Sequence, residues 1–503
     1  MNKLLHLSVS MIGLVMLFGC AVGPDYVKPS APTPEAYKEM KGWKEAQPRE
    51  GVIRGKWWET FNDPGLNALE EQVNISNQNV AAAEAQFRQA RALVQAARAA
   101  YFPTVSAGPS YTRSRSSSTM VSGSSSSGYI SDYLLSFDAS WEPDIWGKVR
   151  RSVESGEANA QASSADLESA RLSAQAELAQ DYFQLQALDA QKQLLDTTVS
   201  AYQKFLDLTV NRYGSGVASR ADVLQAQTQL KTTQAQAIDI GVQRAQTEHA
   251  IALLVGKPAS DFSIPVMQLA ACLPPIPVGV PSDLLERRPD VAGAERRMAA
   301  ANAQIGVAQA AYYPSITLGA SGGYQSSGSA EWLTWPSRFW SVGPAMMETV
   351  FDGGLRKALT EQARAVFDAN VASYRQTVLT GFQEVEDDLA ALRILEEEAR
   401  VQDEAVTAAQ QSVMVTTNQY KAGTASALDV ITTQITELNN KKTAISITGN
   451  RLTASVLLIK ALGGGWSAEA LQPATDNHSH GPGNNDKQPP IGIPEKGMMM
   501  ETK

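Results

Sequence analysis

Two parts of the chain alternate apolar and polar residues with a period of two. The alternation is clearest at 135–141 and returns at 316–324. Because successive side chains of a β-strand point to opposite faces, this pattern predicts strands with one apolar and one polar face. Each strand has a second alternating stretch as a neighbour, so the sequence predicts two β-hairpins, at 104–141 and 315–347.

Most of the remaining chain places its apolar residues three and four positions apart, which is the spacing of one face of an α-helix. Two such segments are very long, at about 150–212 and 355–420, and at 1.5 Å per residue each would reach roughly 90 Å. That length exceeds what a compact domain needs and is typical of a coiled coil or a helical tube. Returning helices are predicted at 219–255 and 426–462, and a first helix at 64–100.

The turn between a long helix and its returning helix occurs twice with nearly the same sequence. Tyr-Gly-Ser-Gly-Val-Ala-Ser-Arg-Ala-Asp occupies 213–222, and Tyr-Lys-Ala-Gly-Thr-Ala-Ser-Ala-Leu-Asp occupies 420–429, 207 residues later. The shared register identifies a tandem duplication with two helical hairpins. In each tip we expect a glycine to end one helix in the left-handed conformation and a serine to cap the next helix. These residues are Gly216 and Ser219 in the first tip and Gly423 and Ser426 in the second.

The duplication sets the organisation of the whole chain, which we expect to be mainly α-helical with membrane β-strands. Pro-rich segments precede, separate and follow the two repeats. The predicted order is a signal peptide at 1–19, a lipidated tether and collar segment at 20–63, a first repeat at 64–256, a collar connector at 257–288, a second repeat at 289–463, and a collar segment with a disordered tail at 464–503.

The charge of the chain argues against a nucleic-acid partner. Asp and Glu number 52 against 43 Lys and Arg, which gives a net charge of −9, and no basic run contradicts this balance. Aromatic residues are only 7% of the chain, while Ala, Gln, Ser and Thr fill the long segments. This composition favours closely packed helices with polar, solvent-exposed faces over a globular domain with a large hydrophobic core.

The first residues are typical of an export signal. Lys3 is followed by an apolar stretch at 4–18 that is too short to span a bilayer. The stretch ends in Leu-Phe-Gly-Cys, which resembles a bacterial lipobox with Cys20 as the lipidated first residue of the mature chain. The alternative is an ordinary signal peptide with a chance cysteine. Cys272 has no other cysteine left with which to form an intramolecular disulfide, so we expect an idle thiol.

The two hairpins together supply four amphipathic strands. Four strands alone cannot lie in a bilayer, because the edges of the sheet would leave backbone groups without partners in hydrocarbon. Several copies of the chain must therefore close the sheet if it lies in a membrane. Three copies would give twelve strands, although the sequence does not fix the number.

Two motifs give the chain a resemblance to a known family. Leu-Glu-Arg-Arg-Pro-Asp-Val at 285–291, followed by Ile-Gly-Val-Ala at 305–308, resembles the mid-chain signature of TolC-like outer-membrane factors. Gly-Pro-Asp-Tyr at 23–26 resembles the NodT-type branch, the outer-membrane efflux lipoproteins of resistance-nodulation-division pumps, and so do the two tips. The resemblance covers about 20–470.

The resemblance implies a homotrimer with a twelve-stranded outer-membrane β-barrel that continues into a long periplasmic α-helical barrel. Its barrel loops would be 114–128 and 326–336. Its partners would be a periplasmic adaptor protein and an inner-membrane resistance-nodulation-division transporter, and it would bind no cofactor apart from the covalent lipid on Cys20. The function implied is a passive exit channel for drugs or other small solutes.

The resemblance also places an aperture gate at the paired tips. Asp222 and Asp429 would form rings of carboxylates by symmetry, whereas the simpler interpretation is that both aspartates favour helix N-termini. Some relatives have an arginine and a second aspartate where this chain has Ala425 and Thr432, so the resemblance does not extend to these two gate contacts. The predicted gate residues are Asp222, Asp429, Tyr213, Tyr420 and Arg220, with Arg220 a candidate partner for Asp429, and the predicted adaptor contacts are Gly216, Ala218, Ser219, Gly423, Ala425 and Ser426.

Catalytic and metal-binding patterns do not emerge from the sequence. It contains no phosphate-binding loop, no Cys-x-x-Cys and no His-Glu-x-x-His. His478 and His480 lie in the predicted tail, His249 lies on a predicted helix, and Met346 with Met347 suits strand packing better than soft-metal transport. We therefore expect neither an enzyme nor a metal protein. The alternative function is a periplasm-spanning coiled-coil lipoprotein without a pore, which would have no use for four period-two strands.

Overall fold

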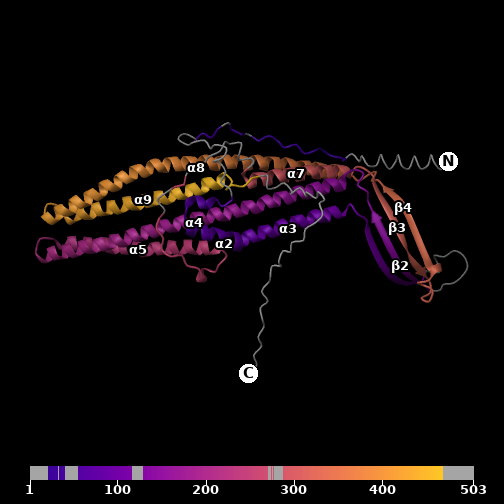
Figure 1. Ribbon diagram of the computed structural model, residues 1–503, viewed down its shortest axis with the longest axis horizontal. Coiled ribbons are helices and arrows are strands. Elements are labelled where there is room, and N and C mark those ends of the chain that lie inside the picture. The colour runs from indigo at the N-terminus through magenta and orange to yellow at the C-terminus, as the bar shows by residue number, and fades with distance from the viewer. Residues whose placement is uncertain are drawn as a thin grey trace, which may run out of the picture. The chain divides into compact units, whose positions relative to one another are not determined.

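The computed structural model describes most of the chain between residues 21 and 467 (Figure 1). The signal peptide, Cys20, Cys272, the tail with its two histidines, and most of the predicted loop at 114–128 lie outside the described residues. The described ranges are 21–31, 33–34, 36–39, 55–115, 129–269, 273–274, 276 and 287–467.

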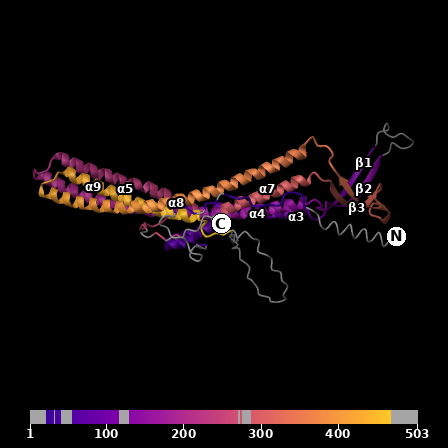
Figure 2. The same cartoon turned by 90° about the horizontal axis from the view of Figure 1, so that it is seen from above.

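Two helical hairpins form the longest part of the fold. Helices α4 (Lys148–Gly214) and α8 (Leu355–Ala422) contain 67 and 68 residues, and α5 (Arg220–Leu254) and α9 (Ala427–Ala461) contain 35 residues each. In Figures 1 and 2 both hairpin tips lie at one end of the helices and the β-strands lie at the other. The shorter elements are 3-10 helices at Trp57–Phe61, Ala259–Asp261 and Trp335–Ser337 and an α-helix, α7, at Pro289–Ala310.

The four strands form a single antiparallel sheet in the order β1-β2-β3-β4; Figure 1 labels β2, β3 and β4, and Figure 2 labels β1, β2 and β3. The two predicted hairpins are joined because β2 pairs with β3, with Leu135 opposite Tyr324. Strands β1 and β4 are the sheet edges, and neither has a second strand partner among the described residues. The strands are β1 (Thr104–Ser114), β2 (Ile130–Trp141), β3 (Ser315–Ser326) and β4 (Arg338–Met347).

The strand register separates an apolar face of the sheet from a polar one, as the alternation predicted. On the polar face, Asp138 accepts a hydrogen bond from Ser321 at 2.7 Å. The apolar face is not covered, since Trp340 and Val342 are 80% and 72% exposed. Its members include Val105, Ala107, Pro109, Tyr111, Tyr133, Leu135, Phe137, Ala139, Trp141, Leu318, Ala320, Tyr324, Trp340, Val342, Pro344 and Met346.

The helix predicted at 64–100 is in fact two helices, α2 (Pro64–Ser76) and α3 (Gln78–Ala99). Asn77 breaks it with an extended ψ of 121°. Its side-chain oxygen accepts hydrogen bonds from the backbone N–H groups of Asn79 and Val80, and its Nδ2 donates to the carbonyl of Leu254 at 2.9 Å. A side chain that caps one helix and binds the end of another overrides the continuous helical pattern.

The break at Asn77 belongs to a joint that occurs once in each repeat. Just as Asn77 caps α3 and bonds to Leu254, Arg288 precedes α7 and donates to the carbonyl of Ala461 at 3.1 Å. Beside the first joint, a Cβ on Gly256 would lie 2.3 Å from a backbone carbonyl oxygen, and beside the second a Cβ on Gly463 would lie 2.0 Å from one. The duplication thus extends to atomic contacts between short and returning helices.

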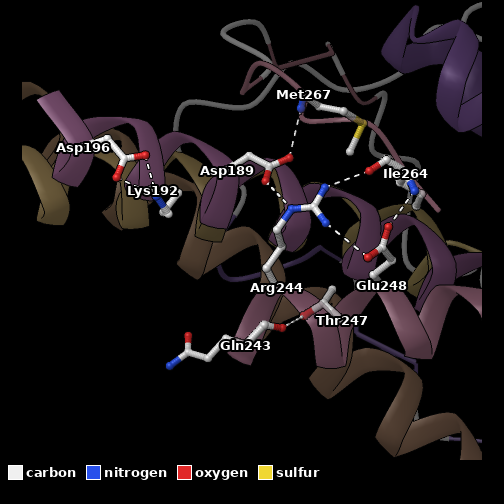
Figure 3. Close-up of polar contacts among 9 residues, drawn as sticks. All are labelled: Asp189, Lys192, Asp196, Gln243, Arg244, Thr247, Glu248, Ile264 and Met267. Carbon is white, nitrogen blue, oxygen red and sulfur yellow. Dashed lines mark hydrogen bonds and ion pairs between the residues drawn. The ribbon is translucent and has the colours of Figure 1, made fainter. Parts of the chain in front are cut away.

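The connector that follows α5 is fastened to the helices by Arg244 (Figure 3). The guanidinium of Arg244 donates to Asp189 of α4 at 2.7 Å, to Glu248 at 3.2 Å and to the carbonyl of Ile264 at 2.8 Å. The second oxygen of Asp189 accepts from the N–H of Met267 at 2.9 Å, and Glu248 accepts from the N–H of Ile264. Each guanidinium nitrogen of Arg244 and all four carboxylate oxygens of Asp189 and Glu248 thus have a partner, and these bonds hold the connector against α4 and α5.

Glu70 of α2 is fully buried, and neither carboxyl oxygen has a hydrogen-bond partner among the described residues. Burial raises the pKa of this carboxyl to about 9, so it is protonated at neutral pH. In the unfolded chain a glutamate ionises near pH 4.3, so stability falls as the pH rises from about 4.3 towards 9. Replacing Glu70 by glutamine removes this ionisation from the unfolded state.

We therefore expect the Glu70→Gln protein to be more stable at pH 8 by up to about 5 kcal/mol, since pH 8 lies about 3.7 units above the unfolded pKa and each unit is worth about 1.36 kcal/mol, and to equal the wild type near pH 4. The measurement is chemical denaturation of the detergent-solubilised protein across this pH range, followed by helical circular dichroism. A constant difference between the two proteins at every pH would contradict the protonated Glu70.

Candidate functional site

The candidate site is the pair of turns at the ends of the two helical hairpins. In the first turn α4 ends at Gly214, and Gly216 adopts the left-handed conformation with φ of 77°. Ser219 then caps α5, because its hydroxyl accepts from the N–H of Asp222 at 3.1 Å, while the Asp222 carboxylate accepts from the N–H of Ser219 at 2.8 Å. This reciprocal pair is a capping box, and it fixes the direction in which α5 returns.

The second turn repeats this geometry. Gly423 ends α8 with φ of 81°. The Ser426 hydroxyl accepts from the N–H of Asp429 at 3.2 Å, and the Asp429 carboxylate accepts from the N–H of Ser426 at 2.9 Å. The bonds from Ser426 hold the pKa of the exposed Asp429 carboxyl below its usual value. Both predicted aspartates therefore cap helices.

The two tips differ at their tyrosines, although the sequence treats them alike. Tyr213 is 47% exposed, whereas Tyr420 is 3% exposed. The ring of Tyr420 packs on Phe205 of the first hairpin with 5.4 Å between ring centroids, and its hydroxyl donates to Thr209 at 3.4 Å. Tyr420 therefore joins the second hairpin to the first, and Tyr213 remains available at the surface of the tip.

Arg212 completes this contact, and sequence reasoning missed it. Its guanidinium lies over the ring of Tyr420, 4.7 Å from the ring centroid, and donates to the carbonyl of Lys421 at 3.2 Å. A cation above an aromatic face is attracted by the ring quadrupole. We call Phe205, Thr209, Arg212 and Tyr420 the tip cluster. Its side chains hold two segments together that are more than 200 residues apart in the chain.

The predicted pairing of Arg220 with Asp429 is absent within this chain. Arg220 is exposed, and Asp429 is bonded to the hydroxyl of Ser426 at 2.7 Å instead. Ser426 is closer because it is part of the same turn. Among the predicted adaptor contacts, Gly216, Ser219, Gly423 and Ser426 are exposed, while Ala218 and Ala425 are half-buried. His249 is exposed on α5, and no group of three or more metal-binding side chains occurs in the described part of the chain.

Comparison with known proteins identifies the family. The family model for outer membrane efflux proteins matches residues 69–257 and 280–464. The chain belongs to the outer membrane efflux protein family. One relative is the probable efflux pump outer membrane protein TtgC of Pseudomonas putida, 32% identical over 475 residues that cover 94% of this chain and 97% of the relative. The solvent efflux pump outer membrane protein SrpC of Pseudomonas putida is 30% identical over 467 residues, which cover 92% and 98%.

Solved structures of two outer-membrane channels have the same fold. The outer-membrane channel OprN matches with a TM-score of 0.84 at 28% identity, covering 89% of this chain and 100% of that one. The Campylobacter jejuni CmeC outer membrane channel matches with a TM-score of 0.82 at 21% identity, covering 89% and 96%, and supports the fold alone. The chain is thus an outer-membrane efflux channel protein of the TolC-like fold, which extends from the outer membrane into the periplasm.

The two ends of the described part of the chain differ in structure. The sheet has an uncovered apolar face, and the helical hairpins extend away from it. No described helix is long and apolar enough to cross a membrane. The tips lie at the end of the helices away from the sheet (Figure 1).

Proposed function

We propose that three copies of this chain close into one exit channel that passively conducts drugs or other small solutes out of the cell. The observation that carries the proposal is the sheet, with its two unpaired edges and an uncovered apolar face. In hydrocarbon an open edge leaves N–H and C=O groups unsatisfied, so strands β1 and β4 must pair with other copies. Three copies would supply twelve strands, and the helical hairpins would close beside them into an α-helical barrel.

In this proposal the channel supplies neither energy nor chemistry. An inner-membrane resistance-nodulation-division transporter would supply the energy, and a periplasmic adaptor would dock on the exposed tip residues, Gly216, Ser219, Gly423 and Ser426. The chain would need no cofactor beyond a lipid on Cys20. Conductance of the purified protein in a planar bilayer tests the proposal, since the alternative, a coiled-coil spacer without a pore, would give none.

The gate gives a sharper test. Three copies would bring Asp222 and Asp429 into rings of negative charge at a narrow aperture, where each carboxylate needs cations or hydrogen bonds to remain ionised. The double variant Asp222→Ala/Asp429→Ala should conduct more than the wild type, lose cation preference, and be blocked less by divalent cations.

The helix caps complicate this comparison, because alanine also removes both capping boxes. A matched variant, Ser219→Ala/Ser426→Ala, weakens the caps but keeps the carboxylates, so it should retain cation preference and block. Native mass measurement should show trimers in both variants. Wild-type conductance, selectivity and cation block in the double aspartate variant would mean that the aspartates act as caps alone.

The lipid anchor is proposed from the sequence and supported by the segment that follows it. The N–H of Val22 donates to the carbonyl of Trp146 at 3.1 Å, and Arg151 donates to Asp25 at 2.9 Å. Trp146 lies between the end of β2 and the start of α4. A lipid two residues before Val22 would therefore lie near the end of the sheet that adjoins the helices. Cys20→Ser should abolish labelling of the protein by radioactive fatty acid, while some trimer still reaches the membrane. Unchanged labelling would assign the lipid to another residue.

A further inference from the structure

The apolar face of the sheet ends in arginines on both edge strands. The register places Arg113 of β1 on the same face as Tyr111, and Arg338 of β4 on the same face as Trp340. Arg115, just beyond β1, continues the alternation. From the loop end towards the helices, each edge strand therefore has the same order on this face: arginine, then an aromatic residue, then apolar residues.

The three arginines are held against aromatic rings and not against acids. Arg113 and Arg115 lie over the ring of Tyr129, at 4.9 and 5.6 Å from its centroid, and Arg338 lies over the ring of Trp335. All three are exposed, and none forms an ion pair among the described residues. Stacking on a ring keeps a guanidinium at the surface, and although Nε of Arg338 also donates to the carbonyl of Trp335 at 3.2 Å, its terminal N–H groups remain exposed for binding.

Nearby acidic residues are too few to neutralise this group. The segment 116–128 between β1 and β2 contains no aspartate or glutamate, and the loop at 327–337 contains only Glu331. The aspartates of the strands, Asp132 and Asp138, lie on the opposite face, where they accept hydrogen bonds from Gln325 and Ser321. The loop end of the apolar face is therefore cationic.

We propose that Arg113, Arg115 and Arg338 form a binding surface for the phosphate groups of outer-leaflet lipids. The inference rests on the proposed membrane position of the sheet, in which its apolar face contacts lipid chains. Tyrosine and tryptophan prefer the membrane–water boundary, so Tyr111 and Trp340 mark that level, and the arginines lie on its water side. Lipids of the outer leaflet of bacterial outer membranes carry phosphates, and guanidinium groups bind phosphate through paired N–H donors.

The arrangement on the sheet edges gives this surface a place in the assembled channel. Arg113 and Arg115 belong to one edge and Arg338 to the other. Where β1 of one copy pairs with β4 of the next, the arginines of two copies would flank the same junction. A phosphorylated lipid bound there would contact both copies and stabilise the closed sheet.

The test compares lipid A, which carries phosphates, with the same lipid A after enzymatic removal of its phosphates. Native mass spectrometry would count the lipids retained by the purified channel. The wild type should retain the phosphorylated form about tenfold more strongly, and the variant R113Q/R115Q/R338Q should lose this preference. The control variant R88Q/R91Q/R375Q removes three exposed helix arginines and should keep it. Added inorganic phosphate should not displace the lipid, because a free phosphate lacks the acyl chains that pack on the sheet.

Insertion into lipid vesicles, measured separately by flotation, distinguishes a failure of the proposed phosphate-binding surface from a failure of the proposed membrane position of the sheet. If the protein inserts but does not discriminate between the two lipids, or if the preference survives in R113Q/R115Q/R338Q, the proposed phosphate-binding surface is wrong. The proposed channel function would not be affected by either result. Displacement by inorganic phosphate would mean a simple anion site. Failure of the wild type to insert would contradict the membrane position of the sheet itself.

Discussion

Replacing Gly463 by alanine is expected to lower the free energy of unfolding by about 2–5 kcal/mol. Two costs add at this position. Gly463 has φ of 93°, a conformation that disfavours any residue with a Cβ, and the added Cβ would lie 2.0 Å from the carbonyl oxygen of Arg287. The oxygen belongs to the backbone just before α7, so it cannot move without shifting that helix. Gly256→Ala should behave in the same way, because its Cβ would meet the carbonyl of Ser76.

A matched control separates the two costs. Gly353 also has a positive φ, 64°, but a Cβ there would meet nothing within 4 Å. Gly353→Ala should therefore cost about 1–2 kcal/mol, the conformational part alone. Thermal unfolding of the three purified variants measures the difference. If Gly463→Ala were no worse than Gly353→Ala, the close approach between α7 and the end of α9 would not exist in solution.

The repeated tip sequence made the helical hairpins predictable. Gly216, Ser219 and their counterparts carry local rules for ending and starting helices, and these rules act within one turn. The strands were predictable for a similar reason, since alternation decides which face is apolar. The helix break at Asn77 was not predictable, because the partner that holds it, Leu254, is distant in sequence and the local pattern continues through it.

The asymmetry of the tips could have been found by comparing the repeats more closely. Tyr420 is buried by Phe205 and Arg212 of the first hairpin. At the same positions of the second hairpin, 207 residues later, the chain has Ser412 and Gln419, which offer Tyr213 neither an aromatic ring nor a cation. Identical motifs therefore have different environments when their neighbours differ. For the tip aspartates, the sequence predicted their role in the helix caps as one of two interpretations. The other interpretation, a ring of charges, depends on how several copies of the chain are arranged, which one sequence does not determine.

Arg288 occupies the second joint, where a different kind of interaction determines stability. Its side chain is 8% exposed and forms ion pairs with Asp290 at 2.7 Å and Glu384 of α8 at 2.6 Å. The same guanidinium donates to the carbonyl of Ala461 at the end of α9. One buried cation thus joins the start of α7 to two other helices. Burying a cation without partners is costly, and here the two carboxylates and the carbonyl compensate that cost.

Replacing Arg288 by methionine should therefore cost about 1.5–3 kcal/mol, because two partly exposed carboxylates and a carbonyl lose their partner while the neighbouring packing stays. Arg288→Lys should cost less, since it restores the charge but cannot reproduce the planar fork that reaches both oxygens of Asp290. The control is Arg364→Met, which breaks an exposed pair with Glu361 and should cost below about 1 kcal/mol. The measurement is the unfolding midpoint of each purified protein. We expect the loss of stability to be largest for Arg288→Met, smaller for Arg288→Lys and smallest for Arg364→Met. Equal losses for Arg288→Met and Arg364→Met would show that the ion pairs of Arg288 add no more stability than a surface pair.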